Sequence, residues 1–169
     1  MPTTPIQIRS YHPSDWPTLW PILQATISTG DTFAFAPESS ADEIKQRWIN
    51  TPQAVFVAHD ESGNLLGSYY LKPNQPGLGS HVCNAGYVVS NAARGQGIAT
   101  LMCEHSQREA KQLGYRAMQF NLVVSTNSGA VRLWQRQGFI IIGTLPGAFA
   151  HRQLGDVDAH VMFKRLAAG

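Results

Sequence analysis

Residues 88–99 read Val88-Val89-Ser90-Asn91-Ala92-Ala93-Arg94-Gly95-Gln96-Gly97-Ile98-Ala99, and this stretch decides the fold class. An apolar strand enters a turn that carries two glycines, and a helix leaves the turn. Gly95 and Gly97 permit backbone conformations and close approaches that a Cβ atom would prevent. The first amides of a helix lack intrahelical partners and lie at the positive end of its dipole, so they can hold a pyrophosphate. The stretch therefore predicts a phosphate-binding turn between a strand and a helix.

Two other interpretations of the glycines are possible. An ordinary strand-to-helix turn uses glycines for geometry alone, and the glycines by themselves leave that reading open. A dinucleotide-binding Rossmann turn needs a third glycine and, about 20 residues on, an acidic residue at a strand end. Residues 111–115 are instead Lys-Gln-Leu-Gly-Tyr, at the end of the helix. A Walker loop is excluded because the sequence holds no Gly-Lys-Ser/Thr.

The apolar periodicity outside this turn predicts both strands and helices. Strands are expected at 6–9, 54–58, 65–71, 84–89, 117–124, 139–143 and 157–163, and helices at 13–28, 40–50, 97–113 and 128–137. Pro17 and Pro21 predict that the first helix is broken or begins late. A loop rich in Gly, Pro and His separates the last two strands. Because strands dominate early and alternate with helices later, we expect an α/β fold with a mixed sheet.

Length and composition predict one soluble domain that covers residues 1–169. The 13 Lys and Arg against 11 Asp and Glu give a net charge of only +2, too little to indicate nucleic-acid binding. The two cysteines, Cys83 and Cys103, form neither a disulfide framework nor a Cys-x-x-Cys zinc pair, so no metal is expected. The N-terminal sequence lacks the features of a signal peptide, and no apolar run approaches the roughly 18 residues that span a bilayer. A cytoplasmic protein without a membrane partner is therefore expected.

Two motifs resemble those of the GCN5-related N-acetyltransferase (GNAT) superfamily. Arg94-Gly95-Gln96-Gly97-Ile98-Ala99 is similar to the acetyl-CoA signature of that family, Arg or Gln followed by x-x-Gly-x-Gly/Ala. Residues 127–139, Asn-Ser-Gly-Ala-Val-Arg-Leu-Trp-Gln-Arg-Gln-Gly-Phe, are similar to its second hallmark, Asn-x-x-Ala-x-x-Leu-Tyr-x-x-x-Gly-Phe. Both motifs occur in the family's order, with a strand between the two helices.

The resemblance implies a mostly antiparallel sheet that is splayed between its fourth and fifth strands, with acetyl-CoA as co-substrate. The pantetheine would lie in the gap, with the strand around Tyr87, Val88 and Val89 on one side and the strand 120–123 on the other. The pyrophosphate would be held by the amides of residues 94–99. The implied cofactor-binding residues are Tyr87, Val88, Val89, Arg94, Gly95, Gln96, Gly97, Ile98, Ala99, Asn127 and Trp134.

Trp134 departs from the family pattern, which often places there a tyrosine that protonates the leaving thiolate. An indole N–H has no accessible pKa and cannot fill that role, so Trp134 either contacts the sulfur or simply packs. Residues 120–123, 127, 133–134 and 138–139 are similar to the branch of yeast proline-analogue acetyltransferases, which acetylate the ring nitrogen of imino acids such as azetidine-2-carboxylate. By that resemblance Asn84 and Asn121 carry the acceptor chemistry. An amide side chain can position an amine or a carboxylate but cannot act as a base.

The expected reaction is direct acetyl transfer to the nitrogen of a small amino or imino acid, without an acetyl-enzyme. Thr32, Phe33 and Phe35 lie in the loop between the first two helices, which commonly lines the acceptor pocket in this fold; core packing is the equal alternative. A protein or peptide amine as acceptor, and an acyl-CoA sensor that has lost catalysis, are the competing functions. The family resemblance also implies a homodimer.

Overall fold

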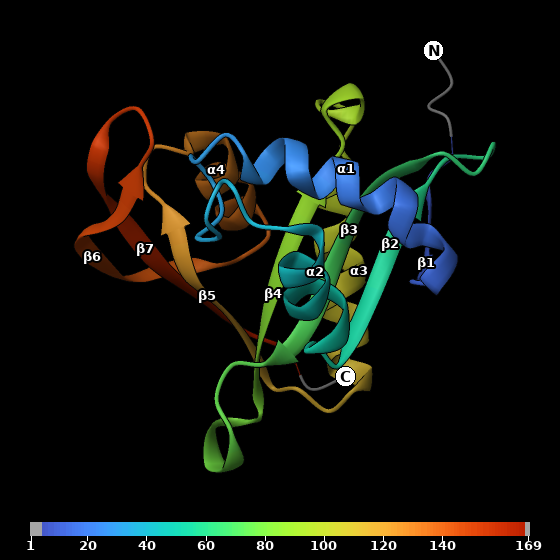
Figure 1. The fold of residues 1–169 in the computed structure, drawn as a ribbon. Helices are drawn as coiled ribbons and strands as arrows, with labels where there is room; N and C mark the ends of the chain where they lie inside the picture. The colour runs from blue at the N-terminus through green and yellow to red at the C-terminus, as the bar shows by residue number, and fades with distance from the viewer. Residues whose placement is uncertain (1–4, 168–169) are drawn as a thin grey trace.

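The computed structural model describes residues 5–167 and contains a seven-stranded sheet in the order β1-β2-β3-β4-β5-β7-β6 (Figure 1). Neighbouring strands are antiparallel except β4 and β5, which are parallel. This arrangement confirms the expected α/β fold with a mostly antiparallel sheet. The strands are β1 (Gln7–Ser10), β2 (Ala54–His59), β3 (Leu65–Pro73), β4 (Val82–Val89), β5 (Ala117–Val124), β6 (Ile140–His151) and β7 (Gly155–Arg165).

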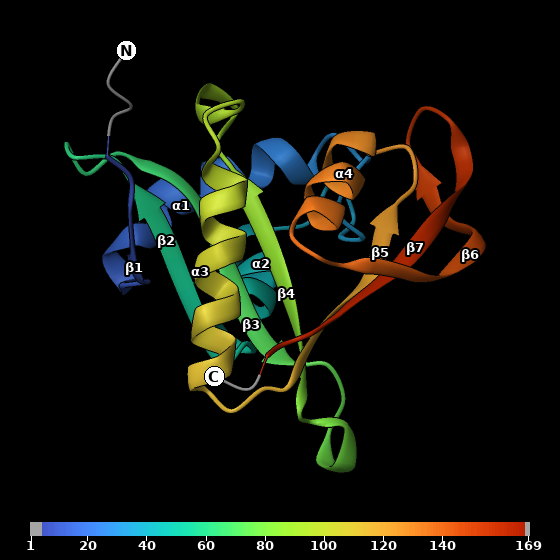
Figure 2. The same ribbon diagram turned by 180° about the vertical axis from the view of Figure 1, so that it is seen from behind.

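Helices cover both faces of the sheet. α1 (Trp16–Ile27) and α2 (Ala41–Lys45) lie in front of it in Figure 1, whereas α3 (Ile98–Gln112) lies in front in Figure 2, which shows the opposite face. α4 (Ser128–Arg136) lies beside β5, between that strand and β6 in the chain. The core accordingly has two parts, one on each face of the sheet. One apolar cluster includes Met102 and Cys103 of α3, and the other includes Leu19 and Leu23 of α1.

The sheet is splayed between β4 and β5, as the sequence resemblance implied. Only two residue pairs join these strands, Val82 with Ala117 and Cys83 with Met118, both at the start of the two strands. Beyond Cys83 the strands diverge, which is visible as the opening between β4 and β5 in Figure 2. The splay brings the backbones of two neighbouring strands to the surface of a shared space.

The predicted ends of three helices agree with the structure to within about one turn, and the helix expected over 40–50 is α2 followed by a π-helical segment over Gln46–Asn50. Gly97, Gly114 and Gly138 have φ values of +79°, +94° and +93°, the left-handed conformation that favours glycine. Ser40 caps α2 by accepting a hydrogen bond from the Glu43 amide at 3.2 Å. The first helix does begin late, at Trp16, after a short 3-10 turn over Pro13–Asp15, and Pro21 lies inside it without ending it.

The closing strands are longer than the sequence indicated. A loop was expected over residues 144–156, but β6 continues to His151 and β7 begins at Gly155, so that only a tight turn separates them. Irregular register between Leu145 and Phe149 accommodates Pro146 and Gly147 in β6. Pro146 is tolerated because β6 is an edge strand, where an N–H donor is not required on the open side.

Candidate active site

The glycine turn after β4 forms the floor of a long groove of about 840 Å³. We call it the turn groove. One wall comes from β4 and the start of α3, and the other comes from α4 and the segment around His151. Of the predicted cofactor residues, those that line it are Tyr87, Val88, Val89, Arg94, Gly95, Gly97, Ile98, Ala99, Asn127 and Trp134. Gln96 is exposed and does not belong to the lining.

The turn groove has the chemistry of an anion site. The first intrahelical hydrogen bond of α3 runs from the Leu101 amide to the Gly97 carbonyl at 3.1 Å. The amides of Ile98, Ala99 and Thr100 therefore precede the helical ladder and remain free to bind a ligand. Arg94 and Arg136 also line the groove and add positive charge. Together these groups fit a pyrophosphate.

A smaller space of about 220 Å³ lies at the splay between β4 and β5. We call it the splay cavity. It shares Thr32, Tyr87, Asn127, Ala130 and Trp134 with the turn groove.

The splay cavity connects the two faces of the sheet. Tyr87 and Trp134 pack with the core cluster on the α3 side, whereas Phe33 and Tyr70 pack with the cluster on the α1 side. All four line this one cavity. The cavity is therefore lined by residues from both faces.

Asn84 and Asn121 both line the splay cavity, from β4 and β5 respectively. Asn84 is buried, and its side-chain amide donates a hydrogen bond to the Gln119 carbonyl at 3.0 Å, directly beyond the last paired residues of the two strands. Asn121 is exposed; its amide donates to the Asn74 side chain at 2.7 Å, and its Oδ1 accepts from Gln119 at 3.0 Å. The structure therefore brings the two asparagines to one cavity, where each is oriented by protein partners.

Trp134 lies where the turn groove meets the splay cavity. Its ring centroid is 5.0 Å from that of Tyr87 and 4.8 Å from that of Phe120. The hydroxyl of Tyr87 is engaged elsewhere, because it hydrogen-bonds Ser106 Oγ at 2.6 Å. Trp134 is half-buried, so packing and contact with a ligand are both compatible with its position.

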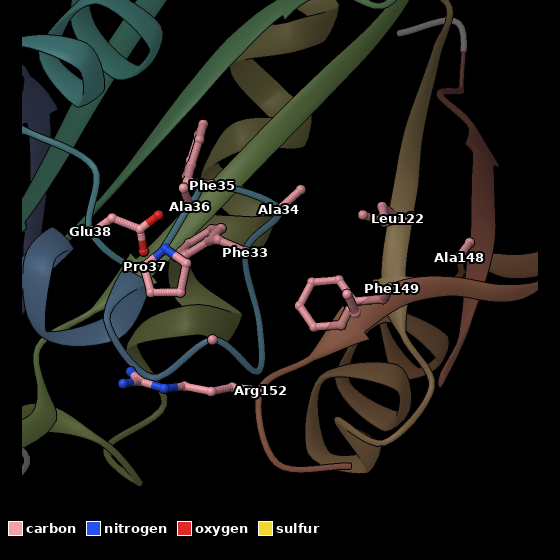
Figure 3. Close-up of a pocket in the computed structure, with 12 residues that line it drawn as sticks. Phe33, Ala34, Phe35, Ala36, Pro37, Glu38, Leu122, Ala148, Phe149 and Arg152 are labelled. Atoms are coloured by element: carbon pink, nitrogen blue, oxygen red, sulfur yellow. The ribbon is translucent and has the colours of Figure 1, made fainter. Parts of the chain in front are cut away.

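A third space of about 400 Å³, which we call the aromatic cavity, lies next to the splay cavity (Figure 3). Phe33, Ala34 and Leu122 line both spaces. Phe33 and the ring of Phe149 lie on opposite sides of the aromatic cavity, and Glu38 and Arg152 lie at its edge. Phe35 lines this cavity only, whereas Thr32 lines the splay cavity and the turn groove.

The two walls of the aromatic cavity are joined by the turn between β6 and β7. The Arg152 amide donates to the Gly30 carbonyl at 3.0 Å, and its guanidinium donates to the Ser28 carbonyl. A Cβ at Gly30 would lie 2.8 Å from the Cβ of Arg152, and Gly30 has a φ of +67°. Glycine at position 30 therefore permits this close contact between the end of α1 and the β6–β7 turn.

The thiols near the site are poorly suited to nucleophilic attack. Burial raises the pKa of Cys83 to about 12 and that of Cys103 to about 11. Neither thiol would be ionised to a useful extent at neutral pH. Within residues 5–167, no group of three or more His, Cys, Asp or Glu side chains could hold a metal ion. Over the same residues, no helix combines the length and apolarity required to cross a membrane.

Among the residues that sequence reasoning did not name as lining the splay and aromatic cavities are Tyr70, Phe149 and Arg152. Tyr70 lies in a strand that was predicted, but alternation alone does not say which face of a strand meets a cavity. Phe149 and Arg152 fall in the stretch that was expected to be a loop. A longer final strand pair would have placed Phe149 in β6 and Arg152 in the turn that follows it.

The family is shown by comparison with known proteins. Residues 16–139 match the model of the acetyltransferase (GNAT) family, which covers well over half of the chain. The chain belongs to this family.

Individual relatives agree with this assignment. The chain is 36% identical over 111 residues to the N-acetyltransferase aca1 of Schizosaccharomyces pombe, a match that covers 65% of this chain and 53% of that protein. The match thus spans about half the length of the yeast protein. A GCN5-related N-acetyltransferase from Kribbella flavida is similar in structure, with a TM-score of 0.90 and 41% identity over 95% of this chain and 98% of the other.

A more distant structure shares the fold. It is a GNAT phosphinothricin acetyltransferase from Sinorhizobium meliloti in complex with acetyl-CoA, with a TM-score of 0.85, 18% identity, and coverage of 97% and 90% of the two chains.

Proposed function

We propose that this protein transfers an acetyl group from acetyl-CoA to the nitrogen of a small amino or imino acid. The observation that carries the proposal is the splay cavity, which joins an anion-binding groove to an aromatic cavity through the sheet. Such a passage allows a thioester and an amine to meet while each is bound on its own side.

The turn groove fits acetyl-CoA, which supplies the activated acetyl thioester. The amides of Ile98, Ala99 and Thr100, with Arg94 and Arg136, would hold its pyrophosphate. The exposed backbone of β4 beyond Cys83 would pair with the amides of its pantetheine, since β5 does not pair there. Gln96 keeps only a geometric role in this proposal, because it does not line the groove.

The size and lining of the two cavities on the acceptor side favour a small molecule. Pockets for small molecules typically enclose about 300–1,000 Å³ and are mostly apolar with a few polar groups. The aromatic cavity, with about 400 Å³ and the side chains of Phe33, Phe35 and Phe149, has this character. The phosphinothricin acetyltransferase of similar fold and the resemblance to proline-analogue acetyltransferases both favour an amino or imino acid.

The transfer is direct in this proposal and needs no metal. The amine nitrogen forms a bond to the acetyl carbon, the carbon–sulfur bond breaks, the nitrogen loses a proton to water, and the CoA sulfur leaves as a thiolate that water can protonate. Asn84 and Asn121 orient the acceptor, because amide groups can hold a carboxylate or an amine without taking up a proton. The amine must approach to about 3–3.5 Å from the acetyl carbon for attack.

Release of free thiol with a panel of amines tests the function. The panel holds azetidine-2-carboxylate, proline, phosphinothricin, free lysine and a peptide with a free N-terminus, each with acetyl-CoA. Turnover is expected with at least one amino or imino acid and to exceed that with the peptide. Turnover confined to the peptide would assign a protein or peptide acceptor. Binding of acetyl-CoA by calorimetry without turnover of any amine would assign a sensor.

The two asparagines are expected to affect different kinetic constants. Asn121→Ala should lower kcat about tenfold, because it misaligns the attacking nitrogen, whereas Asn84→Ala should mainly raise the acceptor KM. Neither change should alter the acetyl-CoA KM, which depends on groups in the turn groove. Steady-state kinetics with Asn50→Ala as the control would measure this, since Asn50 is exposed and lines none of the three spaces. Wild-type constants in both variants would leave Asn84 and Asn121 as structural residues.

The cysteines are expected to be dispensable. Cys83→Ala and Cys103→Ala should keep turnover within about threefold of wild type, because buried, protonated thiols are poor nucleophiles. Mass spectrometry of the wild-type enzyme quenched during turnover should show no acetylated cysteine. An acetyl group trapped on Cys83, with loss of activity in Cys83→Ala, would replace direct transfer by an acetyl-enzyme mechanism.

A cytoplasmic homodimer completes the proposal. β6 is an edge strand of 12 residues, with Ile140 61% and Ile142 54% exposed. A long apolar edge of this kind invites pairing with another strand, and a second copy of this chain supplies one. Sedimentation should show a dimer for wild type and for Leu78→Lys, which changes a fully exposed loop leucine, and a monomer for Ile142→Lys. A wild-type monomer would contradict the dimer.

A further inference from the structure

Tyr70 of β3 lines the splay cavity from the α1 side of the sheet, whereas Tyr69 and Tyr87 pack with the apolar cluster on the α3 side. Neighbouring residues of a strand point to opposite faces. Tyr69 accordingly points toward α3, where its hydroxyl bonds His105 Nδ1 at 2.6 Å. Tyr70 points to the α1 side and lines the cavity together with Asn84 and Asn121. Tyr70 is thus the sheet tyrosine whose hydroxyl can reach a ligand on the acceptor side.

The ring of Tyr70 is held in a fixed position by its surroundings. Trp48 meets it edge-on, with ring centroids 4.9 Å apart and planes at 88°, and the Lys72 ammonium lies 5.5 Å from the ring centroid. On β4, Gly86 is the residue directly opposite. A Cβ at Gly86 would lie 2.5 Å from Cε1 of Tyr70 and 2.9 Å from its hydroxyl oxygen. The absence of a side chain at Gly86 therefore lets the phenol lie directly over the β4 backbone.

The Tyr70 hydroxyl is a donor that the protein leaves for a ligand. Within residues 5–167, no hydrogen bond to another side chain or to the backbone engages it. The amides of Asn84 and Asn121, in contrast, already donate to Gln119 and Asn74. Burial raises the pKa of Tyr70 to about 12, so the hydroxyl keeps its proton at neutral pH.

We propose that Tyr70 is a catalytic residue whose hydroxyl donates a hydrogen bond to the acetyl oxygen as negative charge develops there during attack by the amine. This inference rests on the proposed acetyltransferase function. No proton is transferred from Tyr70: the nitrogen–carbon bond forms, the carbon–sulfur bond breaks, and the phenol retains its hydrogen throughout. A preformed donor aimed at the oxygen where charge develops stabilises the transition state without reorganisation.

The position of Tyr70 distinguishes this role from that of an acid for the leaving thiolate. Trp134 and Tyr87 line both the splay cavity and the turn groove, but Tyr70 lines only the splay cavity. It therefore approaches the reacting carbon from the acceptor side and not from the side of the CoA sulfur. Trp134 occupies the position where the family often has a tyrosine acid, and Tyr70 does not take over that acid role.

The kinetic test is Tyr70→Phe, which removes the hydroxyl and keeps the ring over Gly86. We expect kcat to fall about 100-fold, the usual effect of removing one such donor, with the acetyl-CoA KM unchanged. Tyr69→Phe is the matched control, because it removes a hydroxyl on the opposite face and should leave kcat near wild type. The melting temperature of Tyr70→Phe should stay near that of wild type, since its hydroxyl bonds no protein group.

A binding test needs no turnover. S-carboxymethyl-CoA places a carboxylate where the acetyl group would lie, and S-ethyl-CoA places an uncharged group of similar size there. By calorimetry, Tyr70→Phe should bind the carboxymethyl analogue about tenfold more weakly than wild type, because a donor to a charged oxygen is lost. Both proteins should bind the ethyl analogue equally.

Two results would overturn the role of Tyr70. One is a kcat within threefold of wild type with equal binding of both analogues. The other is an effect confined to the acceptor KM, which would make Tyr70 a binding residue for the amine. A wild-type protein that turns over no amine would instead refute the proposed function, and the analogue pair would still report whether Tyr70 donates into the cavity.

Discussion

Replacement of Gly97 by valine is expected to weaken acetyl-CoA binding at least tenfold. Gly97 has a φ of +79° at the start of α3, and a β-branched residue in that conformation is strained by about 1–3 kcal/mol. Relief of the strain would rotate the amides of Ile98 and Ala99 away from the pyrophosphate. Because about 1.4 kcal/mol corresponds to a factor of ten, even a modest distortion reaches the expected loss. Calorimetry with acetyl-CoA measures it.

Gly63→Val provides a control with matched strain. Gly63, in the turn between β2 and β3, has a φ of +83°, and like Gly97 it has nothing within 4 Å of an added Cβ. Both variants should lose similar thermal stability, but Gly63→Val should bind acetyl-CoA as wild type does. Equal and undiminished binding by the two variants would show that the glycine turn does not hold the pyrophosphate.

Gly67→Ala is expected to cause a large loss of stability for a single added methyl group. A Cβ at Gly67 would lie 2.6 Å from the Val88 carbonyl oxygen and 3.0 Å from Cε of Met102. The carbonyl belongs to the backbone of β4 and cannot move without separating the strands. We expect a loss of about 3 kcal/mol in the free energy of unfolding, at the upper end of overpacking effects.

Urea denaturation of Gly67→Ala and Gly143→Ala measures the difference. Gly143 also lies in a strand, but nothing is within 4 Å of its added Cβ, so alanine there should be neutral or slightly stabilising. A loss below about 1 kcal/mol in Gly67→Ala would mean that β3 and β4 can shift apart without much cost.

The central elements could be predicted from the sequence because the residues that begin and end them are close by in the chain. β5 was expected at 117–124 and is found there, and Gly114 and Gly138 end the helices before it and after it. The turn at 94–99 follows from the same local chemistry, whereas Tyr87, Asn127 and Trp134 were named through the family resemblance. For these elements the residues that set the boundaries lie directly beside the elements in the chain.

The parts that were not predicted depend on contacts between distant segments. Pro146 and Gly147 are loop residues by composition, yet they lie in β6 because β7 pairs with that strand on one side only. The orientation of Tyr70 depends on where α1, α2 and α3 lie relative to the sheet, which alternation in β3 does not reveal. The wall formed by Phe149 and Leu122 likewise needs β5, β6 and β7 to be placed together.

In the proposed reaction, the donor site and the acceptor site are built from different segments of the chain. The donor side depends on the backbone of the turn and of α3, where few substitutions are compatible with the geometry. The proposed acceptor side is formed by residues 33–38, 148–150 and Arg152, in a loop and at the end of an edge strand. Substitutions there would alter the shape and charge of the aromatic cavity without changing residues that line the turn groove. New acceptor preferences can therefore arise by a few changes on one face, while the other face keeps the same chemistry for every substrate.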